Sequence, residues 1–482
     1  MKATNFIAGI VSSLGTSRRR FFAAIGTGVV ALAVIGFAAP GSPKLIVHEW
    51  GTFTSVQGAD GALMDWRPLE TVDLPKFVYN WSNPGFNRAA GGKLALTKSV
   101  MITLQRMETP VIYLYSDEEL TANVSVRFPQ GTITEWYPQA RQIGPASVKP
   151  PKLVTQLDAG AHKLGAKPEF TFGSLLPQHA AKDSRIVWSD VRVLPAKQHE
   201  GIAGLVPLDK SGSHYYAARE TDAEFVRVNS GSKTNTAPEH ERFLFYRGVG
   251  SFTTPLAVTM NPDNNLTITN KGADTLLDLF VLSVRDGKAQ FVHLNRLDSN
   301  AATFVALPPS DHPQADIARK IADEMAAALV SAGLFEREAV AMVNTWKDSW
   351  FADEGLRVFY LLPRAWTDAT LPLQIDPKPQ AVIRVMVGRA EIISTELENR
   401  LRQQLTKAQS GDLEARTQAL AELKKLGRFA QPAVQRIARN ASDAQFNQFA
   451  WGLLQAATKH ESSPNRAARA SNAPAAGQAG GL

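Results

Sequence analysis

Short apolar runs alternate with polar residues over the first long section of the chain, residues 43–310. Gly, Pro and Asn separate the runs, and Asp286-Gly287 stands between two of them, as in a hairpin with a two-residue turn. Many short strands at regular spacing are typical of antiparallel β-sandwiches. We therefore expect one sandwich, or a pair, from the runs 45–48, 111–115, 123–128, 186–194, 243–247, 256–260, 279–285 and 289–294.

Beyond residue 310 the apolar residues recur with the period of a helix. Ile317, Ile321, Met325 and Leu329 form one stripe, and a second stripe follows over residues 339–350. Strand-like runs then return, near 356–362 and 382–387. The pattern predicts a mixed α/β segment over residues 311–394, either an independent domain or an insertion on the sandwich.

Residues 395–458 have the pattern of a small helical segment. Thr395 and Glu398 have the spacing of a capping box, and the stretch 419–434 resembles the turn of a HEAT-type helical repeat. Two or three helices are too few for a free-standing solenoid, so we expect this segment to dock on the rest of the protein. Residues 459–482, rich in Ser, Ala, Pro, Asn and Gly, are predicted to form a disordered tail. The whole pattern predicts a mainly β protein with α-helices.

The first 39 residues have the pattern of an export signal. They contain Lys2 and three successive arginines, and they contain no acidic residue. The apolar run over 21–39 is diluted by Gly and Thr, whereas a membrane span needs about 20 strongly apolar residues. The stretch 17–22 resembles a twin-arginine signal. A cleaved signal and an uncleaved N-terminal anchor both stay open, and either one predicts a periplasmic or extracellular location. We expect no transmembrane domain after the signal.

The composition narrows the possible chemistry. The chain has no cysteine, which excludes disulfides, a thiolate nucleophile and zinc or iron–sulfur sites with sulfur ligands. The formal net charge is +7, and the basic residues of the predicted signal supply more than half of it. The remaining mild excess gives little support for nucleic acid as a partner. The sequence identifies neither a cofactor nor a metal.

The string from His48 to Thr54 is the most distinctive place for chemistry, because it delivers a His-Glu pair and a Trp to a Gly break. His48 and Glu49 are candidate catalytic residues, as metal ligand or general base. Neighbouring residues on a strand point to opposite faces, so both reach one pocket only if the strand ends or bulges. The alternative is a buried, structural pair. Trp50 and Thr52 are candidate ligand-binding residues.

Glu108 and Glu135 are the other catalytic candidates, since each is a carboxylate within a predicted strand. Two carboxylates on facing strands can act as acid and base on a glycoside, provided that their separation is right. The alternative is that each pairs with an arginine. Trp136 and Tyr137 are candidate ligand-binding residues, because an exposed aromatic face stacks on sugars, although tryptophan is more often buried.

Four strings of this sequence resemble a family of exported bacterial proteins of uncharacterised function that share the motif His-Glu-Trp-Gly-Thr-Phe-Thr. The resemblance spans most of the chain after the predicted signal, in the stretches 48–54, 107–113, 134–138 and 385–391. Since the family has no assigned activity, the resemblance implies export and supplies no catalytic residues.

These patterns favour an exported binding or scaffold protein of the periplasm or cell surface, whose partner is an envelope polymer or another protein. The rival hypothesis is a metal-assisted or carboxylate-based hydrolase that acts on glycan or another envelope polymer. An enzyme is expected to bring His48, Glu49, Glu108 and Glu135 to one concave pocket. In a binding protein, these four residues are expected to lie apart from one another.

Overall fold

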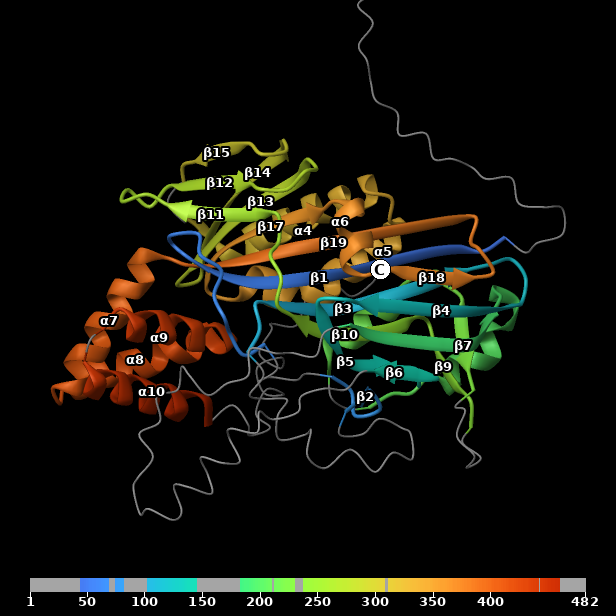
Figure 1. Ribbon diagram of the computed structural model, residues 1–482, viewed down its shortest axis with the longest axis horizontal. Coiled ribbons are helices and arrows are strands. Elements are labelled where there is room, and N and C mark those ends of the chain that lie inside the picture. The colour runs from blue at the N-terminus through green and yellow to red at the C-terminus, as the bar shows by residue number, and fades with distance from the viewer. Residues whose placement is uncertain are drawn as a thin grey trace, which may run out of the picture. The chain divides into compact units, whose positions relative to one another are not determined.

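The computed structural model describes residues 44–68, 74–81, 102–144, 183–209, 212–229, 237–307, 311–441 and 443–459. The predicted signal over 1–39 and the predicted tail beyond residue 459 lie outside these residues. The described part contains three β-sheets and two groups of helices (Figure 1). The mainly β fold with α-helices that the sequence predicts is confirmed.

The largest sheet has ten strands, and β1 and β19 lie at its centre. These two strands are parallel over thirteen residue pairs, whereas the sequence predicts antiparallel pairing. β1 opens the predicted section 43–310 and β19 belongs to the predicted segment 311–394, so both contribute to this one sheet. In spatial order its strands are β16 (His312–Pro313), β14 (Lys288–Leu297), β13 (Leu276–Arg285), β17 (Gly355–Leu362), β19 (Ala381–Ile393), β1 (Ile46–Gly58), β3 (Gln105–Tyr115), β10 (Leu244–Gly250), β5 (Gly131–Tyr137) and β2 (Tyr79–Asn80).

Two antiparallel sheets pack on one face of the large sheet, and we call this side its sheet-covered face. Val47, Phe53, Ile112 and Met386 of the large sheet share a buried core with both smaller sheets. One of these contains β18 (Leu373–Asp376), β4 (Leu120–Phe128), β7 (Ser184–Leu194), β8 (Phe225–Val228), β9 (Glu239–Glu241) and β6 (Gln142–Gly144). The other contains β11 (Leu256–Met260), β12 (Leu266–Asn270) and β15 (Ala302–Val305).

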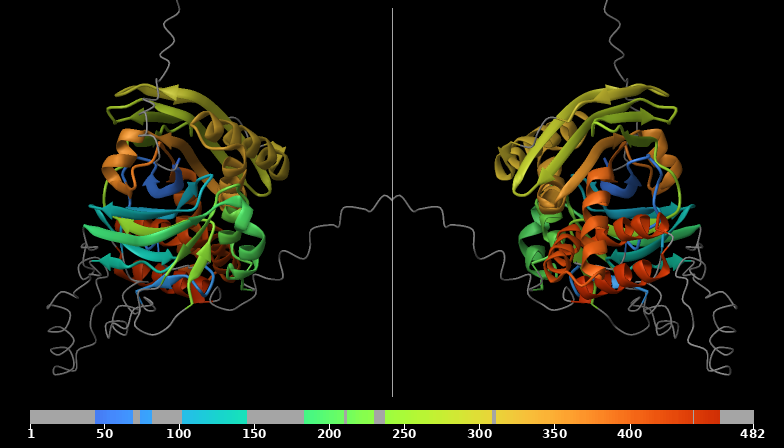
Figure 2. Two further views of the ribbon diagram at one scale, coloured as in Figure 1. Left: turned by 90° about the vertical axis from the view of Figure 1, so that its right-hand side faces the viewer. Right: turned by 90° about the vertical axis from the view of Figure 1, so that its left-hand side faces the viewer.

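Helices cover the opposite side, which we call the helix-covered face (Figure 2). Trp50 and Phe245 of the sheet pack there with Ile321 of α4 and Met342 of α5. The predicted stripes thus lie on buried helix faces. In chain order, the helices before the C-terminal segment are η1 (Ala196–Gln198), α3 (His199–Ile202), η2 (Ala203–Leu205), η3 (His214–Arg219), α4 (Gln314–Ser331), α5 (Glu336–Lys347), the π-helix η4 (Asp348–Ala352) and α6 (Arg364–Thr370).

The predicted hairpin at Asp286-Gly287 joins β13 to β14. Asp286 has φ 49° and Gly287 has φ 76°. Two successive positive φ angles are what a tight hairpin turn requires, and Asp-Gly is a preferred pair for it. The local sequence therefore determines this turn.

The C-terminal helical segment packs on the end of the large sheet, as expected from the sequence. Val56 of β1 and Ile393 of β19 enter the same buried core as Leu401 and Ile437. The cap of the first helix is Ser394, one residue before the predicted Thr395, because its hydroxyl accepts from the backbone N–H of Leu397. The helices are α7 (Thr395–Gln409), α8 (Leu413–Leu426), η5 (Gly427–Phe429), α9 (Ala430–Arg439) and α10 (Ala444–Lys459). Among the described residues, the helices are too short or too polar to cross a membrane.

Candidate functional site: an arginine-lined pocket at the edge of the sandwich

His48 points into the helix-covered face of β1. Its Nδ1 lies 2.6 Å from Oε2 of Glu338 on α5, and the Tyr115 hydroxyl donates to the other oxygen of that carboxylate at 2.7 Å. Phe335 stacks near the imidazole, with ring centroids 4.4 Å apart. His48 is 2% exposed. The imidazole therefore belongs to a buried polar pair.

Glu49, the next residue, points into the sheet-covered face. The Tyr246 hydroxyl donates to its Oε1 at 2.5 Å, and Nε of Arg384 donates to its Oε2. Burial lowers the pKa of Arg384, but the charge of Glu49, together with Tyr246 and the hydrogen bonds to Glu49 and Asp368, holds that pKa above its ordinary value. The register between β1 and β3 shifts at Gly51, but β1 itself continues through this residue, so His48 and Glu49 stay on opposite sides of one sheet.

Glu108 receives two hydrogen bonds from Nη1 of Arg428, at 2.9 and 3.0 Å, and a third from the Thr54 hydroxyl at 2.5 Å. Burial raises the pKa of Glu108, but the charges of Arg428 and then Arg106 outweigh it, and the pKa lies below its ordinary value. Glu108 is thus a buried carboxylate that stays ionised.

Glu135 accepts from Nε of Arg247 at 3.1 Å, and the two residues are direct partners across β5 and β10. Arg247 lies opposite the irregular stretch of β3 that contains Glu108. Glu108 and Glu135 therefore meet in one cluster of arginines on the helix-covered face. Of the four predicted catalytic residues, these two come together, whereas His48 lies farther along β1 and Glu49 lies on the other face.

The four predicted ligand-binding residues are all buried. Trp50, Thr52 and Tyr137 lie on the helix-covered face, and Trp136 lies on the sheet-covered face, with 3% exposure or less for each. None of these aromatic rings offers an open face for sugar stacking. The described part of the chain also holds no group of three or more His, Asp or Glu side chains in metal-binding proximity.

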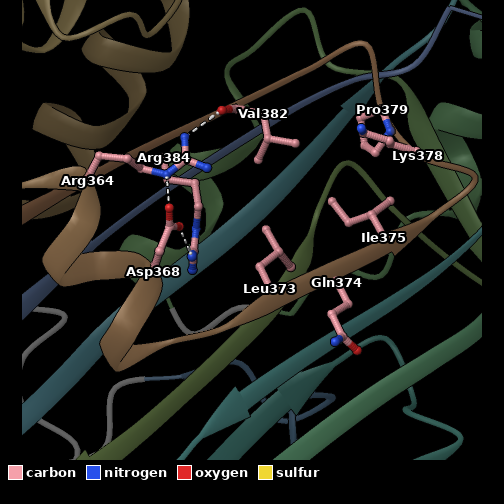
Figure 3. Close-up of a pocket in the computed structure, with 9 residues that line it drawn as sticks. All are labelled: Arg364, Asp368, Leu373, Gln374, Ile375, Lys378, Pro379, Val382 and Arg384. Atoms are coloured by element: carbon pink, nitrogen blue, oxygen red, sulfur yellow. Dashed lines mark hydrogen bonds and ion pairs between the residues drawn. The ribbon is translucent and has the colours of Figure 1, made fainter. Parts of the chain in front are cut away.

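A pocket of about 310 Å³ lies beside Arg384, and Figure 3 shows its lining residues. The first residues of β19 form one wall, helix α6 forms another, and the edge strand β18 forms the third. Its lining residues are Arg364, Asp368, Leu373, Gln374, Ile375, Lys378, Pro379, Val382 and Arg384.

Asp368 connects the two arginines of this pocket (Figure 3). Its Oδ1 accepts from Nη1 of Arg384 at 2.7 Å, and its Oδ2 accepts from Nε of Arg364 at 2.8 Å. Arg364 also donates to the Val382 carbonyl at 2.7 Å. Together these bonds fix the direction of both guanidinium groups.

One nitrogen of the Arg384 guanidinium takes part in none of these hydrogen bonds. Its side chain is 1% exposed, and its Nη2 is buried without a hydrogen-bond partner in the described part of the protein. A buried donor without a partner costs about 1–3 kcal/mol, more when the donor is charged. With Lys378 and Arg364, Arg384 gives the lining three cations, which the carboxylate of Asp368 in the lining and that of Glu49 behind Arg384 balance only in part. The pocket therefore suits a ligand that brings an anionic group.

None of the residues predicted as catalytic or ligand-binding lines this pocket. Arg384 was missed, although the sequence carries a signal for it, since it is a lone charge within the apolar strand run 382–387. A charge at a buried strand position needs a partner, and that partner is Glu49. Arg364 and Asp368 lie on a short helix whose position no local pattern predicts.

Comparison with models of protein families gives no match, and comparison with curated proteins gives none. Among solved structures, the chain is similar to a yeast delta-COP-I mu-homology domain in complex with a Dsl1 WxWxV peptide, at 8% identity and a TM-score of 0.22. A second structure of the yeast delta-COP-I mu-homology domain gives 7% identity and a TM-score of 0.21. Each comparison covers 73% of this chain and 97% of the other.

Proposed function

We propose that this protein is an exported binding protein that holds a carboxylate-bearing ligand in the pocket beside Arg384. The observation that carries the proposal is that Arg384 lines the pocket while its buried Nη2 lacks a partner among the described residues. Arginine presents a planar fork of donors that matches a carboxylate. Leu373, Ile375 and Val382 supply the apolar remainder of the lining.

Glu49 and Asp368 act as positioning residues in this proposal. Glu49 holds Nε of Arg384 from the core side, and Asp368 holds its Nη1 from the pocket side. The guanidinium is thereby ordered before a ligand arrives, which lowers the entropy cost of binding. Export rests on the twin-arginine pattern at residues 17–22, and carboxylates occur on both the envelope polymers and the protein partners that the sequence favours.

A hydrolase remains the alternative from the sequence, and the geometry supports it less. Its four candidates are each engaged in a buried pair, and they lie on two faces of the sheet. A catalytic acid and base must reach the same substrate atom, within hydrogen-bond distance. Binding needs only the pocket and its cations.

The test compares a carboxylate with its neutral isostere. Calorimetric titration of the full chain with isovalerate is expected to show saturable binding, and titration with isovaleramide is expected to show at least tenfold weaker binding. Arg384→Lys keeps the charge beside Glu49 but removes the fork, so we expect it to weaken isovalerate binding about tenfold, or about 1.4 kcal/mol. Arg296→Lys, on an exposed arginine, is the matched control. Equal affinity for acid and amide refutes the proposal.

A further inference from the structure

The cluster around Glu108 and Glu135 is rich in arginine. Among the described residues, Arg106, Arg247 and Arg428 face these two carboxylates. Arg247 is 1% exposed and Arg428 is 14% exposed. Removing an ion from water costs several kcal/mol even after relaxation, so the buried donors of the Arg247 and Arg428 guanidinium groups need partners.

Several polar atoms in and beside the cluster are buried and make no hydrogen bond within the described part of the chain. Two are guanidinium nitrogens, Nη2 of Arg247 and Nη2 of Arg428. The others are Oγ1 of Thr52 and Nε1 of Trp346. Three of these four groups are donors only, and the hydroxyl can donate. A set of buried donors without protein partners is typical of a site that binds an ion or an ordered water.

The strand register and the ring contacts bring these groups together. Thr52 is the direct partner of Glu108 across β1 and β3, and Arg428 bonds to that same carboxylate. On the other side of β3, Arg247 lies opposite its irregular stretch. Trp346 lies against His214, with ring centroids 4.9 Å apart.

The arginines of this region affect the pKa of His214. Burial, together with the charges of Arg247, Arg106 and Arg428, lowers its pKa to about 4, against the opposing charge of Glu108. The imidazole is therefore neutral at pH 7 and adds no charge of its own. Because the charges of all three arginines act on this pKa, His214 lies close to all three.

Further buried arginines lie toward the C-terminal helices. Arg389 and Arg357 share the carboxylate of Glu391, at 2.9 and 3.1 Å, and Asp353 lies 3.6 Å from Nη2 of Arg389. Arg389 and Arg428 lie over the ring of Phe429, 5.1 and 4.9 Å from its centroid. The joint between the large sheet and the C-terminal helical segment is thus rich in arginine.

We propose that a small inorganic anion, of the size of chloride or sulfate, binds in the interior between Arg247 and Arg428. Nη2 of each arginine donates to it, and the Thr52 hydroxyl and the Trp346 indole N–H complete its contacts. Because Arg428 belongs to η5 and Arg247 belongs to the large sheet, the anion fastens the C-terminal helical segment to the sheet. This site is separate from the Arg384 pocket, which lies on the other face of the sheet.

The experiment is thermal unfolding of the full chain in sodium gluconate, with chloride or sulfate replacing gluconate at constant ionic strength. We expect the midpoint temperature of unfolding to rise by several degrees between about 1 and about 100 mM chloride or sulfate. An anion that binds only the folded protein, with a dissociation constant in this range, stabilises it by mass action. A midpoint that does not depend on either anion overturns the proposal.

Thr52→Val separates this site from general salt effects, because the substitution keeps the shape and removes only the hydroxyl. Without an anion, the loss of an unpartnered hydroxyl is neutral or stabilising. With an anion in the site, Thr52→Val is expected to reduce at least twofold the rise of the unfolding midpoint with chloride or sulfate concentration. Thr303→Val, in β15 of the three-stranded sheet, is the control and is expected to keep the full dependence. Equal slopes for the unmodified protein and both variants refute the site.

A crystal soaked in sodium bromide gives a second, independent measurement. The anomalous signal is expected to show one bromide within hydrogen-bond distance of Nη2 of Arg247 and Nη2 of Arg428. If the cluster is instead closed by protein groups alone, the anomalous map is empty there and the proposal fails.

Discussion

Glu49 and Arg384 are direct partners in the parallel pair of β1 and β19, and their side chains form an ion pair across the two strands. Both side chains are 1% exposed or less. These residues are 335 positions apart in the sequence. The pair therefore holds together the two central strands, and the same guanidinium lines the only pocket that we describe.

Replacing one partner of this pair is expected to be costly. Glu49→Gln leaves the buried charge of Arg384 with only the half-exposed carboxylate of Asp368, and we expect a loss of about 3–5 kcal/mol in the free energy of unfolding. Tyr246→Phe removes one hydrogen bond to the same carboxylate and is expected to cost about 1 kcal/mol. Urea unfolding measures both. Similar stability of Glu49→Gln and the unmodified protein contradicts a structural role for the pair.

The ion pair of Glu108 and Arg428 predicts a loss of stability in acid. The folded-state pKa of Glu108 lies below its ordinary value of about 4.3, so its contribution is complete above that value and is lost as the pH falls through the folded-state pKa. We expect Arg428→Met to destabilise the protein strongly at pH 7 and much less near pH 3. Denaturant unfolding at both pH values measures the difference, and an equal effect at both contradicts the assignment.

His214 predicts a second pH dependence. Its folded-state pKa is about 4, whereas an unfolded histidine titrates near 6.5. Between these values the unfolded chain binds more protons, so stability falls as the pH is lowered from about 6.5 to about 4. We expect His214→Gln to flatten the pH profile of the unfolding free energy by up to one proton in this interval. His312→Gln, on an exposed histidine, is the control and is expected to leave the profile unchanged.

The core shared by the sheet and the C-terminal helices predicts cooperative unfolding. Ile437→Ala removes a fully buried side chain from this core and is expected to cost about 2–5 kcal/mol. We expect one unfolding transition by calorimetry and faster proteolysis within α7–α10. Leu413→Ala, on a side chain that is 77% exposed, is the control. Two separate transitions contradict firm docking of this segment.

Export is tested at the paired arginines of the predicted signal. Arg18→Lys with Arg19→Lys keeps the charge of the segment and removes the twin-arginine pattern. We expect the variant to accumulate in the cytoplasm, as measured by cell fractionation. Undiminished secretion contradicts the twin-arginine assignment and leaves the Arg384 pocket unaffected.

The sequence predicts those features that depend on neighbouring residues. The period of Ile317, Ile321 and Met325 places one buried face on α4, and Asp286-Gly287 specifies its hairpin, because both depend only on local geometry. Alternation along β1 correctly separates His48 from Glu49. These predictions need no knowledge of the rest of the chain.

Contacts between distant parts of the chain could not be predicted. Local patterns carry no information on which strand lies beside β1, so its parallel pairing with β19 was unexpected. The pocket depends on that pairing, because Arg384 reaches it only from β19. For the same reason, the sequence suggests that Glu108 and Glu135 each pair with an arginine, but it does not identify Arg428 and Arg247 as the partners.

The position of β19 beside β1 has a consequence for synthesis on the ribosome. The nascent chain exposes all thirteen residues of β1 long before residue 381 emerges to cover one of its edges. An uncovered strand edge in the middle of an unfinished sheet is a template for aggregation. Until residue 381 and the rest of β19 have been made, this edge of β1 is therefore the place where two unfinished chains can pair.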